Sequence, residues 1–142
     1  MDGLDVAIRG IEPSRFDTSS AYVVWSPDDR DVQVARLLRT RDLGATWVNV
    51  GTRIPGARRV NVVREDPFRR GLLFAGTDRS VFISFDDGDA WQPLRLNLPA
   101  VPVTDLLLKD ADLIAGTGGR GVWRLEDLTP LHPNSRYVLE VS

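Results

Sequence analysis

The sequence has no cysteine among its 142 residues, and it has only one histidine, His132, and one lysine, Lys109. Without cysteine, the chain can form no disulfide, no thiolate nucleophile and no cysteine-ligated zinc site. The lone histidine lacks the partners that a Ser-His-Asp triad or a histidine metal site would need. We therefore expect no metal and no cofactor.

The sequence also lacks a long apolar run and a strong net charge. No run approaches the ~18 residues of a membrane span, and residues 1–5 show neither the basic nor the apolar region of a signal peptide. The net charge of −2 gives no general attraction to nucleic acid or to anionic membranes, so we expect neither as a partner. A hydrophobic content of 42% with 27% charged residues is typical of a globular protein.

Helical periodicity is missing as well. No segment combines about ten residues of clean 3.6-residue periodicity with helix caps, so we expect very little helix. The chain instead alternates short apolar segments, rich in Val, Ile, Phe and Leu, with turn segments such as residues 86–89, Asp-Asp-Gly-Asp. This pattern predicts an all-β protein built from short strands.

An internal repeat is the strongest signal in the sequence. Residues 40–47 and 84–91 share the pattern Ser/Thr-x-Asp-x-Gly-x-Thr/Ala-Trp, and their aspartates lie 44 positions apart. We call these two segments the first box and the second box. A weaker third copy follows, because residues 72–77 recur as 112–117, although its box at 125–130 has lost the Gly and the Trp.

Each repeat predicts four short strands, which is the sequence signature of a β-propeller blade. We expect one partial propeller unit over residues 1–142, with blade 1 at about 6–52, blade 2 at about 58–97 and blade 3 at about 102–142. The expected strands are 7–11, 21–25, 34–40 and 46–50 in the first blade, 59–63, 71–76, 80–85 and 91–96 in the second, and 103–108, 112–116, 121–125 and 136–141 in the third.

The box residues have a structural explanation that needs no ligand. A Gly two residues after the Asp allows the positive φ of a tight hairpin, and the Asp carboxylate can accept hydrogen bonds from backbone N–H groups further along the turn. The Ser or Thr offers a hydroxyl to the same turn, and the Trp anchors the next strand. We assign this structural role to Thr40, Asp42, Gly44, Thr46, Trp47, Ser84, Asp86, Gly88 and Trp91.

The two boxes resemble the Asp-box, or BNR, repeats of sialidase-like and sortilin-like (VPS10-type) β-propellers. Residues 62–67, 73–77, 101–106 and 119–128 are similar to the last blades of large bacterial propeller proteins described as glycosyl hydrolases with BNR repeats. That group usually has Thr-His-Gly-Arg-Gly where residues 117–121 read Thr-Gly-Gly-Arg-Gly, so any role of that histidine is absent here. In the superfamily the boxes lie away from the catalytic centre, and relatives are usually exported. The resemblance thus implies a fold rather than a reaction, and it implies a signal peptide upstream of this segment.

No catalytic residue is assigned, because with 20 acidic residues a glycosidase carboxylate pair can always be nominated. Arg15 and Arg64 are taken as equivalent residues at the end of a first strand, and Arg120 follows a later strand. These three residues and Glu65 are the candidate ligand-facing residues. They favour a non-catalytic binding or scaffold module that contacts a protein or a glycan. The alternative is a fragment of a polysaccharide-active hydrolase, sialidase-like or xyloglucanase-like, whose catalytic residues lie elsewhere.

Three blades cannot close a ring, since propellers have typically 4–8. An open arc leaves an apolar sheet face at each end, and such a face usually marks a partner or an aggregation site. Three arrangements remain open: the chain is the C-terminal part of a larger propeller, two copies close a six-bladed ring, or the strands collapse into a smaller sandwich-like stack.

Overall fold

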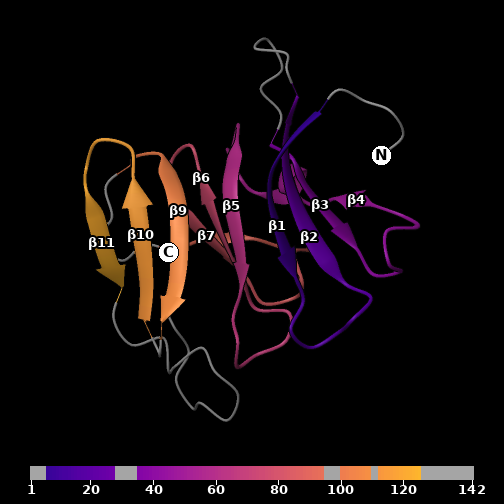
Figure 1. Cartoon of the computed structure of the whole chain (residues 1–142). Coiled ribbons are helices and arrows are strands. Elements are labelled where there is room, and N and C mark those ends of the chain that lie inside the picture. The colour runs from indigo at the N-terminus through magenta and orange to yellow at the C-terminus, as the bar shows by residue number, and fades with distance from the viewer. Residues whose placement is uncertain (1–5, 28–34, 95–99, 110–111, 126–142) are drawn as a thin grey trace.

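A computed structural model describes residues 6–27, 35–94, 100–109 and 112–125. These residues form three antiparallel sheets that lie side by side, each built from strands that are consecutive in the chain (Figure 1). We call the sheets blades 1, 2 and 3. The only helical element in the described part is a single 3₁₀ turn, η1 (Gly51–Arg53), so the all-β prediction is confirmed.

The strand order within each blade follows the chain without a crossover. Blade 1 contains β1 (Val6–Pro13), β2 (Ala21–Pro27), β3 (Leu37–Thr40) and β4 (Val48–Asn49). Blade 2 contains β5 (Val60–Glu65), β6 (Leu73–Thr77), β7 (Val81–Ser84) and β8 (Gln92–Pro93). Blade 3 contains β9 (Val103–Lys109), β10 (Asp112–Thr117) and β11 (Val122–Leu125). Among the described residues, no helix is long and apolar enough to cross a membrane.

The fourth strands are shorter than the sequence predicts. β4 has two residues, where we expected 46–50. Of the expected strand 91–96, β8 takes up two residues, and 95–96 lie outside the described residues. In blade 2 the strand meets Pro93, which has no N–H to donate. In blade 1 the side-chain oxygen of Asn49 accepts the N–H of Leu37 at 3.2 Å in place of a ladder bond. The expected strand 136–141 and the degenerate third box beyond Leu125 lie outside the described residues.

Blade 2 is covered on both faces and forms the centre of the core. Leu72, Leu73, Phe74 and Ala75 are consecutive, and all four are fully buried, so side chains on both faces of the sheet are excluded from water. Burial of each Leu or Phe stabilises the fold by roughly 1.5–3 kcal/mol. Blade 2 therefore reads as a nearly continuous apolar sequence because each of its faces has a neighbour.

The core divides into two clusters, one at each joint between blades. At the joint of blades 1 and 2 the buried cluster consists of Tyr22, Val24, Ala35, Leu37, Val50, Ile54, Val60, Val63, Leu73, Ala75, Phe82 and Trp91. At the joint of blades 2 and 3 it consists of Val62, Leu72, Phe74, Val81, Ile83, Leu94, Val103, Leu106, Leu113 and Ala115, with Trp123 packed against it. We call the face of a blade that meets the next blade its trailing face, and the opposite face its leading face.

The first strand of every blade contains a β-bulge at the same place. The register shifts between Ile8 and Gly10 in β1, between Val60 and Val62 in β5, and opposite Gly116 and Thr117 in β9. Each shift leaves one residue without a partner across the sheet: Arg9, Asn61 and Thr104. A bulge redirects the side chain of its extra residue. The first strands lie next to one another (Figure 1), so the three redirected side chains share one side of the molecule.

Gly76 permits the close approach of blade 3 to blade 2. A Cβ on Gly76 would lie 2.7 Å from Val62 Cγ1, 2.8 Å from Val103 Cγ1 and 3.0 Å from the Val103 carbonyl oxygen. Gly116 is the equivalent residue of blade 3. Each glycine lies on the second strand of its blade and pairs with the residue that follows the bulge on the first strand. A Cβ on Gly116 would have no neighbour closer than 3.8 Å.

These two glycines predict opposite outcomes for the same substitution. Gly76→Ala should lower the free energy of unfolding by about 1–3 kcal/mol, because the new methyl group overpacks the joint of blades 2 and 3. Gly116→Ala is the matched control and should change stability by no more than about 0.5 kcal/mol. Urea denaturation of both variants measures the difference. Equal effects at the two positions would contradict the packing of blade 3 against blade 2.

Candidate functional site

The first box folds into a turn held by its own side chains. Thr40 Oγ1 donates to Asp42 Oδ1 at 2.8 Å and accepts the N–H of Gly44 at 2.9 Å. Asp42 also accepts the N–H of Thr46 at 2.8 Å and the Thr46 hydroxyl. These bonds satisfy backbone groups that the tight connection of β3 to β4 would otherwise leave open.

The second box repeats this network. Ser84 Oγ donates to Asp86 Oδ1 and accepts the N–H of Gly88, both at 2.8 Å, and Asp86 accepts the N–H of Ala90 at 2.9 Å. Trp91 Nε1 donates to the Gly88 carbonyl at 2.9 Å, which fixes the indole in the joint of blades 1 and 2.

Hydrogen bonds occupy the carboxylates of both boxes. The Thr46 hydroxyl, followed by the Thr46 N–H and the Thr40 hydroxyl, lowers the pKa of Asp42 below its ordinary value, so the group is held as a carboxylate. A carboxylate saturated by donors from its own turn is a poor general acid and a poor metal ligand. The geometry of both boxes is that of turn-forming residues.

The second box also clamps blade 2 to blade 1. Arg39 Nη1 on β3 donates to the carbonyl of Asp87 and to Asp89 Oδ1, both at 2.8 Å. Arg41 pairs with Asp87 at 2.8 Å, and Arg53 pairs with Asp89 at 2.8 Å. The hydrogen bond from Arg39 lowers the pKa of Asp89. Because Arg39 is buried, its charge requires these partners, and the clamp fixes the second box against the trailing face of blade 1.

Tyr22 completes the clamp from β2. Its hydroxyl donates to Asp87 Oδ1, and its ring is buried in the cluster between blades 1 and 2. Burial raises the pKa of Tyr22 well above its ordinary value, and the hydrogen bond to Asp87 raises it further. The phenol is therefore held in its neutral form, as a structural donor.

Glu65, a candidate ligand-facing residue, bonds to protein groups in the structure. Its side chain is buried, and its carboxylate accepts Ser14 Oγ at 2.9 Å and the N–H of Arg15 at 2.9 Å. Both donors belong to blade 1. Glu65 thus links the end of β5 to the turn that follows β1, and its carboxylate oxygens face protein donors rather than solvent.

The prediction that Arg15 and Arg64 occupy equivalent positions of the repeat was wrong. Pro13 pairs with Ala21, and Glu65 pairs with Leu73, so the two strand ends match in the structure. Arg64 lies within β5, whereas Arg15 lies beyond the end of β1. The sequence alignment relied on an Asp in each turn, but that Asp closes the turn at a different place in each blade.

The aspartates of these two turns show why the alignment slipped. Asp17 accepts the N–H of Ser19 at 2.9 Å, whereas Asp66 accepts the N–H of Phe68 at 2.7 Å. Hydrogen bonds from Ser19, followed by one from Ser20, lower the pKa of Asp17 to about 2. Asp17 and Asp66 thus both accept backbone N–H groups of a turn, but at different positions. The two turns, from β1 to β2 and from β5 to β6, are equal in length by their ladder pairing.

Of the four candidates, Arg64 lies at a concave surface, which is described below. Arg15 and Arg120 are exposed, and they lie at opposite ends of the blades: Arg15 follows the end of β1, and Arg120 lies in the turn from β10 to β11, near the start of β9. The structure therefore does not bring the four residues together into one site.

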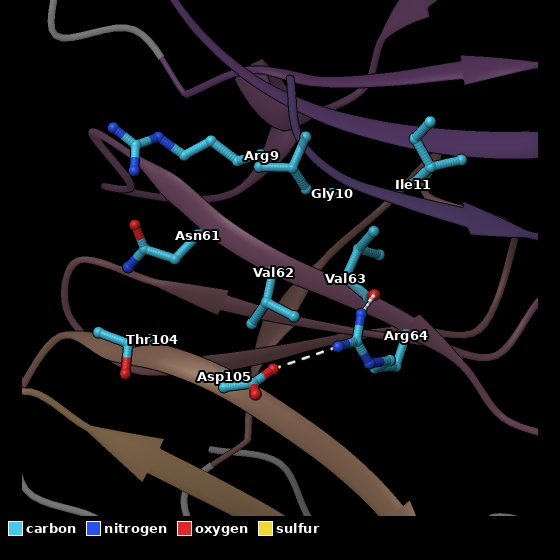
Figure 2. A pocket seen from close by; sticks show the side chains of 10 residues that line it. Arg9, Gly10, Ile11, Asn61, Val62, Val63, Arg64, Thr104 and Asp105 are labelled. Carbon is cyan, nitrogen blue, oxygen red and sulfur yellow. Dashed lines mark hydrogen bonds and ion pairs between the residues drawn. The ribbon is translucent and has the colours of Figure 1, made fainter. Parts of the chain in front are cut away.

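A hollow of about 370 Å³ crosses the first strands of all three blades. The three bulge residues, Arg9, Asn61 and Thr104, line it together with Arg64 and Asp105, and Figure 2 shows side chains from three separate strands around it. The apolar part of its wall comes from Ile11, Val24, Val62 and Val63. We take this hollow as the candidate functional site, and we call it the central hollow.

Arg64 is the fixed charge of the central hollow. Its Nε donates to the Leu106 carbonyl at 3.0 Å. Its Nη1 donates to the Val63 carbonyl at 3.0 Å, and Nη2 pairs with Asp105 at 3.2 Å, as Figure 2 shows. The guanidinium thus spans blades 2 and 3 with a single orientation, whereas the Asp105 side chain is 73% exposed. A rigid cation beside an exposed carboxylate gives the hollow a fixed polarity.

Asn61 and Arg9, two further polar residues of the hollow, differ in how their hydrogen-bonding groups are used. Asn61 donates its side-chain N–H groups to the carbonyls of Thr77 at 3.3 Å and Val103 at 3.0 Å. Arg9 is exposed on β1. The Thr104 hydroxyl donates to the Gly116 carbonyl at 3.3 Å. The hollow therefore offers the guanidinium groups of Arg9 and Arg64 as donors, and the side-chain oxygens of Asn61, Thr104 and Asp105 as acceptors.

The central hollow lacks the usual layout of a glycosidase. Asp105 is the single carboxylate among the described residues that line it, whereas glycoside hydrolysis uses two carboxylates that flank the scissile bond. The arrangement can bind a ligand by hydrogen bonds and charge, and by itself it supplies no acid–base pair.

Sequence reasoning missed Arg9, Asn61, Thr104 and Asp105. A signal for the first three exists: segments 8–11, 60–63 and 103–106 each carry an apolar residue, then a polar bulge residue, and end on an apolar residue. The signal is weak because nothing in one segment marks the bulge, which is visible only when the three blades are aligned by their ladders.

The raised pKa of Tyr22 predicts a loss of stability at high pH. An unfolded tyrosine ionises near pH 10, whereas the folded Tyr22 resists ionisation. Deprotonation therefore stabilises the unfolded state relative to the folded state as the pH rises above about 10. We expect the free energy of unfolding to fall between pH 9.5 and about 11 in the wild type, and to fall less in Tyr22→Phe. Urea denaturation across this range measures both slopes. Identical slopes would contradict the buried, neutral Tyr22.

No protein-family model matches the chain, and none of the curated proteins does. Among solved structures, an ancestral GH74 enzyme superposes with a TM-score of 0.62 and 16% identity, over 80% of this chain and 14% of that chain. The GH74 enzyme of Niastella koreensis gives a TM-score of 0.61 and 11% identity, over 84% and 21%. YCF48 bound to a D1 peptide gives 0.52 and 17%, over 89% and 39%.

This chain therefore spans a minor part of each protein that it resembles. Identities of 11–17% show a common fold and nothing finer. The chain has the fold of a partial β-propeller.

Proposed function

We propose that this chain is a non-catalytic binding module whose ligand lies in the central hollow. The observation that carries the proposal is the position of the three bulges, which place Arg9, Asn61 and Thr104 around one concave surface. A bulge gives up a ladder pairing, and bulges are over-represented beside functional sites. The blades supply a rigid scaffold for that surface.

A peptide segment is the ligand that this surface favours. An extended peptide presents carbonyl oxygens and N–H groups in a row, and the hollow offers donors on β1 and β5 and acceptors on β5 and β9, with an apolar wall between them. The similarity in fold to YCF48 bound to a D1 peptide supports a protein ligand, although the likeness extends to the fold alone. A glycan, whose hydroxyls could use the same donors, is the alternative ligand.

The module also needs a partner for its open blade faces. We propose that another blade covers them, either from the remainder of a larger propeller or from a second copy of this chain. The support is physical: a blade buries apolar side chains on two faces, as blade 2 does, while within the part of the chain that the structure describes blades 1 and 3 have one neighbour each.

A second candidate function is supported by the position of Asp105. The chain could be the fragment of a polysaccharide hydrolase in which Asp105 supplies one carboxylate and another segment supplies the second. The similarity in fold to two GH74 enzymes favours this candidate. Against this candidate, Arg64 engages Asp105, and the described residues that line the hollow hold no second carboxylate.

The binding proposal predicts a selective effect of Arg9. On arrays of peptides and of glycans, Arg9→Ala should weaken capture of the bound ligand by about tenfold, because a charged hydrogen bond in a partly enclosed site is worth about 1.5 kcal/mol. Arg15→Ala is the matched control: it removes the same exposed side chain beyond the other end of β1, and it should leave capture unchanged. Thermal melting of both variants shows that the fold is intact.

Three outcomes separate the candidate functions. Capture of peptides that depends on Arg9 supports the proposal. Equal effects of Arg9→Ala and Arg15→Ala would remove the central hollow as the site. Release of reducing ends from xyloglucan that is abolished by Asp105→Asn would favour the hydrolase instead.

A further inference from the structure

The three bulge residues differ in what their side chains leave for a ligand. Asn61 donates its side-chain N–H groups to the carbonyls of Thr77 at 3.3 Å and Val103 at 3.0 Å. Thr104 donates its hydroxyl to the Gly116 carbonyl at 3.3 Å. Backbone carbonyls of blades 2 and 3 thus use the donors of these two bulge residues. What Asn61 and Thr104 leave for a ligand is the oxygen of each side chain, which accepts hydrogen bonds.

Arg9, the bulge residue of blade 1, keeps its donors. Its side chain is exposed, and within the part of the chain that the structure describes no carboxylate or carbonyl accepts its N–H groups. Glu12, the acidic residue of β1, bonds instead to the N–H of Glu65 at 2.9 Å. A guanidinium carries five N–H donors in a planar fork that matches the two oxygens of a carboxylate. The largest unused set of donors in the hollow therefore belongs to one cation.

The charges around the central hollow do not cancel. Arg64 pairs with Asp105 at 3.2 Å, which leaves Arg9 as the cation without a carboxylate among the described residues that line the hollow. In Figure 2 the three bulge side chains lie at one end of the hollow, and Arg64 lies toward the other end. The end with the bulges thus combines an uncompensated positive charge with two oxygens that accept hydrogen bonds.

We propose that the ligand of the central hollow is an extended peptide with an acidic side chain, whose carboxylate pairs with Arg9. This inference rests on the proposed function, and it adds the charge and the chemical class of the ligand. The carboxylate accepts the free N–H groups of Arg9, and N–H groups of the same peptide donate to the side-chain oxygens of Asn61 and Thr104. A forked pair of this kind fixes the orientation of the ligand as well as its charge.

Other ligand classes match the hollow less well. A nucleic acid would bring a row of phosphates past the Asp105 side chain, which is 73% exposed and repels them. A neutral glycan could donate hydroxyls to Asn61 and Thr104, but it would leave the charge of Arg9 without a partner. An acidic peptide uses the cation and the acceptor oxygens together.

Arrays of matched peptides test the charge preference. The probes are acetylated and C-terminally amidated hexapeptides in which one position carries Glu, Gln or Lys, so that the charge changes while the backbone stays the same. A single-stranded oligonucleotide is the fourth probe. The wild type should capture the best Glu peptide about tenfold more strongly than its Gln counterpart at low salt. This ratio should fall at high salt, because Arg9 is exposed to solvent ions.

Two substitutions of Arg9 and one control complete the experiment. Arg9→Gln should bring the ratio of Glu to Gln capture to about one, and Arg9→Glu should reverse the preference in favour of Lys peptides. Arg15→Glu changes the charge of another exposed arginine that does not line the hollow, and it should leave the ratio unchanged. Thermal melting of the three variants shows that each is folded.

The outcomes separate this inference from the proposed function. Equal capture of Glu and Gln peptides by the wild type, lost in Arg9→Ala, would overturn the acidic ligand while the hollow remained a peptide site. A Glu preference that survives Arg9→Gln would also overturn the inference, because the charge would then be recognised elsewhere. Capture of the oligonucleotide through Arg9 in place of the Glu peptides would make a nucleic acid the ligand. Capture of no peptide at all would overturn both proposals.

Discussion

The structure depends on one constraint: the apolar faces of neighbouring sheets pack against each other and leave water. Blade 2 meets the constraint fully, with Phe74 and Ile83 against blade 3 and Leu73 and Phe82 against blade 1. Dispersion and the hydrophobic effect set the blades face to face, and polar contacts such as Arg39 with Asp89 fix their relative position. The central hollow follows from this stacking, because it exists only where three first strands lie side by side.

The ends of the blades have separate tasks. The boxes and the turns after the first strands hold saturated carboxylates such as Asp42 and Glu65, which connect strands and blades. The bulges near the start of the first strands instead direct polar side chains away from the ladder and into the hollow. This division between scaffold and site is common: packed elements form a rigid scaffold, and a local break in backbone pairing places the side chains of the site.

The sequence predicted what depends on local chemistry. Thr40, Asp42 and Gly44 lie within five residues, so their turn could be inferred from spacing alone, and the apolar segments marked nearly every strand. Contacts across blades could not be inferred in this way. The partners of Asp87 belong to another blade, and Glu65 is buried by a turn 50 residues earlier. The hollow was missed because bulges are a property of ladder register, which the sequence encodes only weakly.

Native-state hydrogen exchange tests the central claim that blade 2 is stabilised by neighbours on both faces. We predict that the amides of β6 and β7 exchange most slowly, since their opening requires both joints to separate. Those of β10 and β11 should exchange faster, because among the described residues blade 3 has a neighbour on one face. Equal protection of β10 and β6, or blade 2 opening before its neighbours, would contradict the stacking of three blades around a central one.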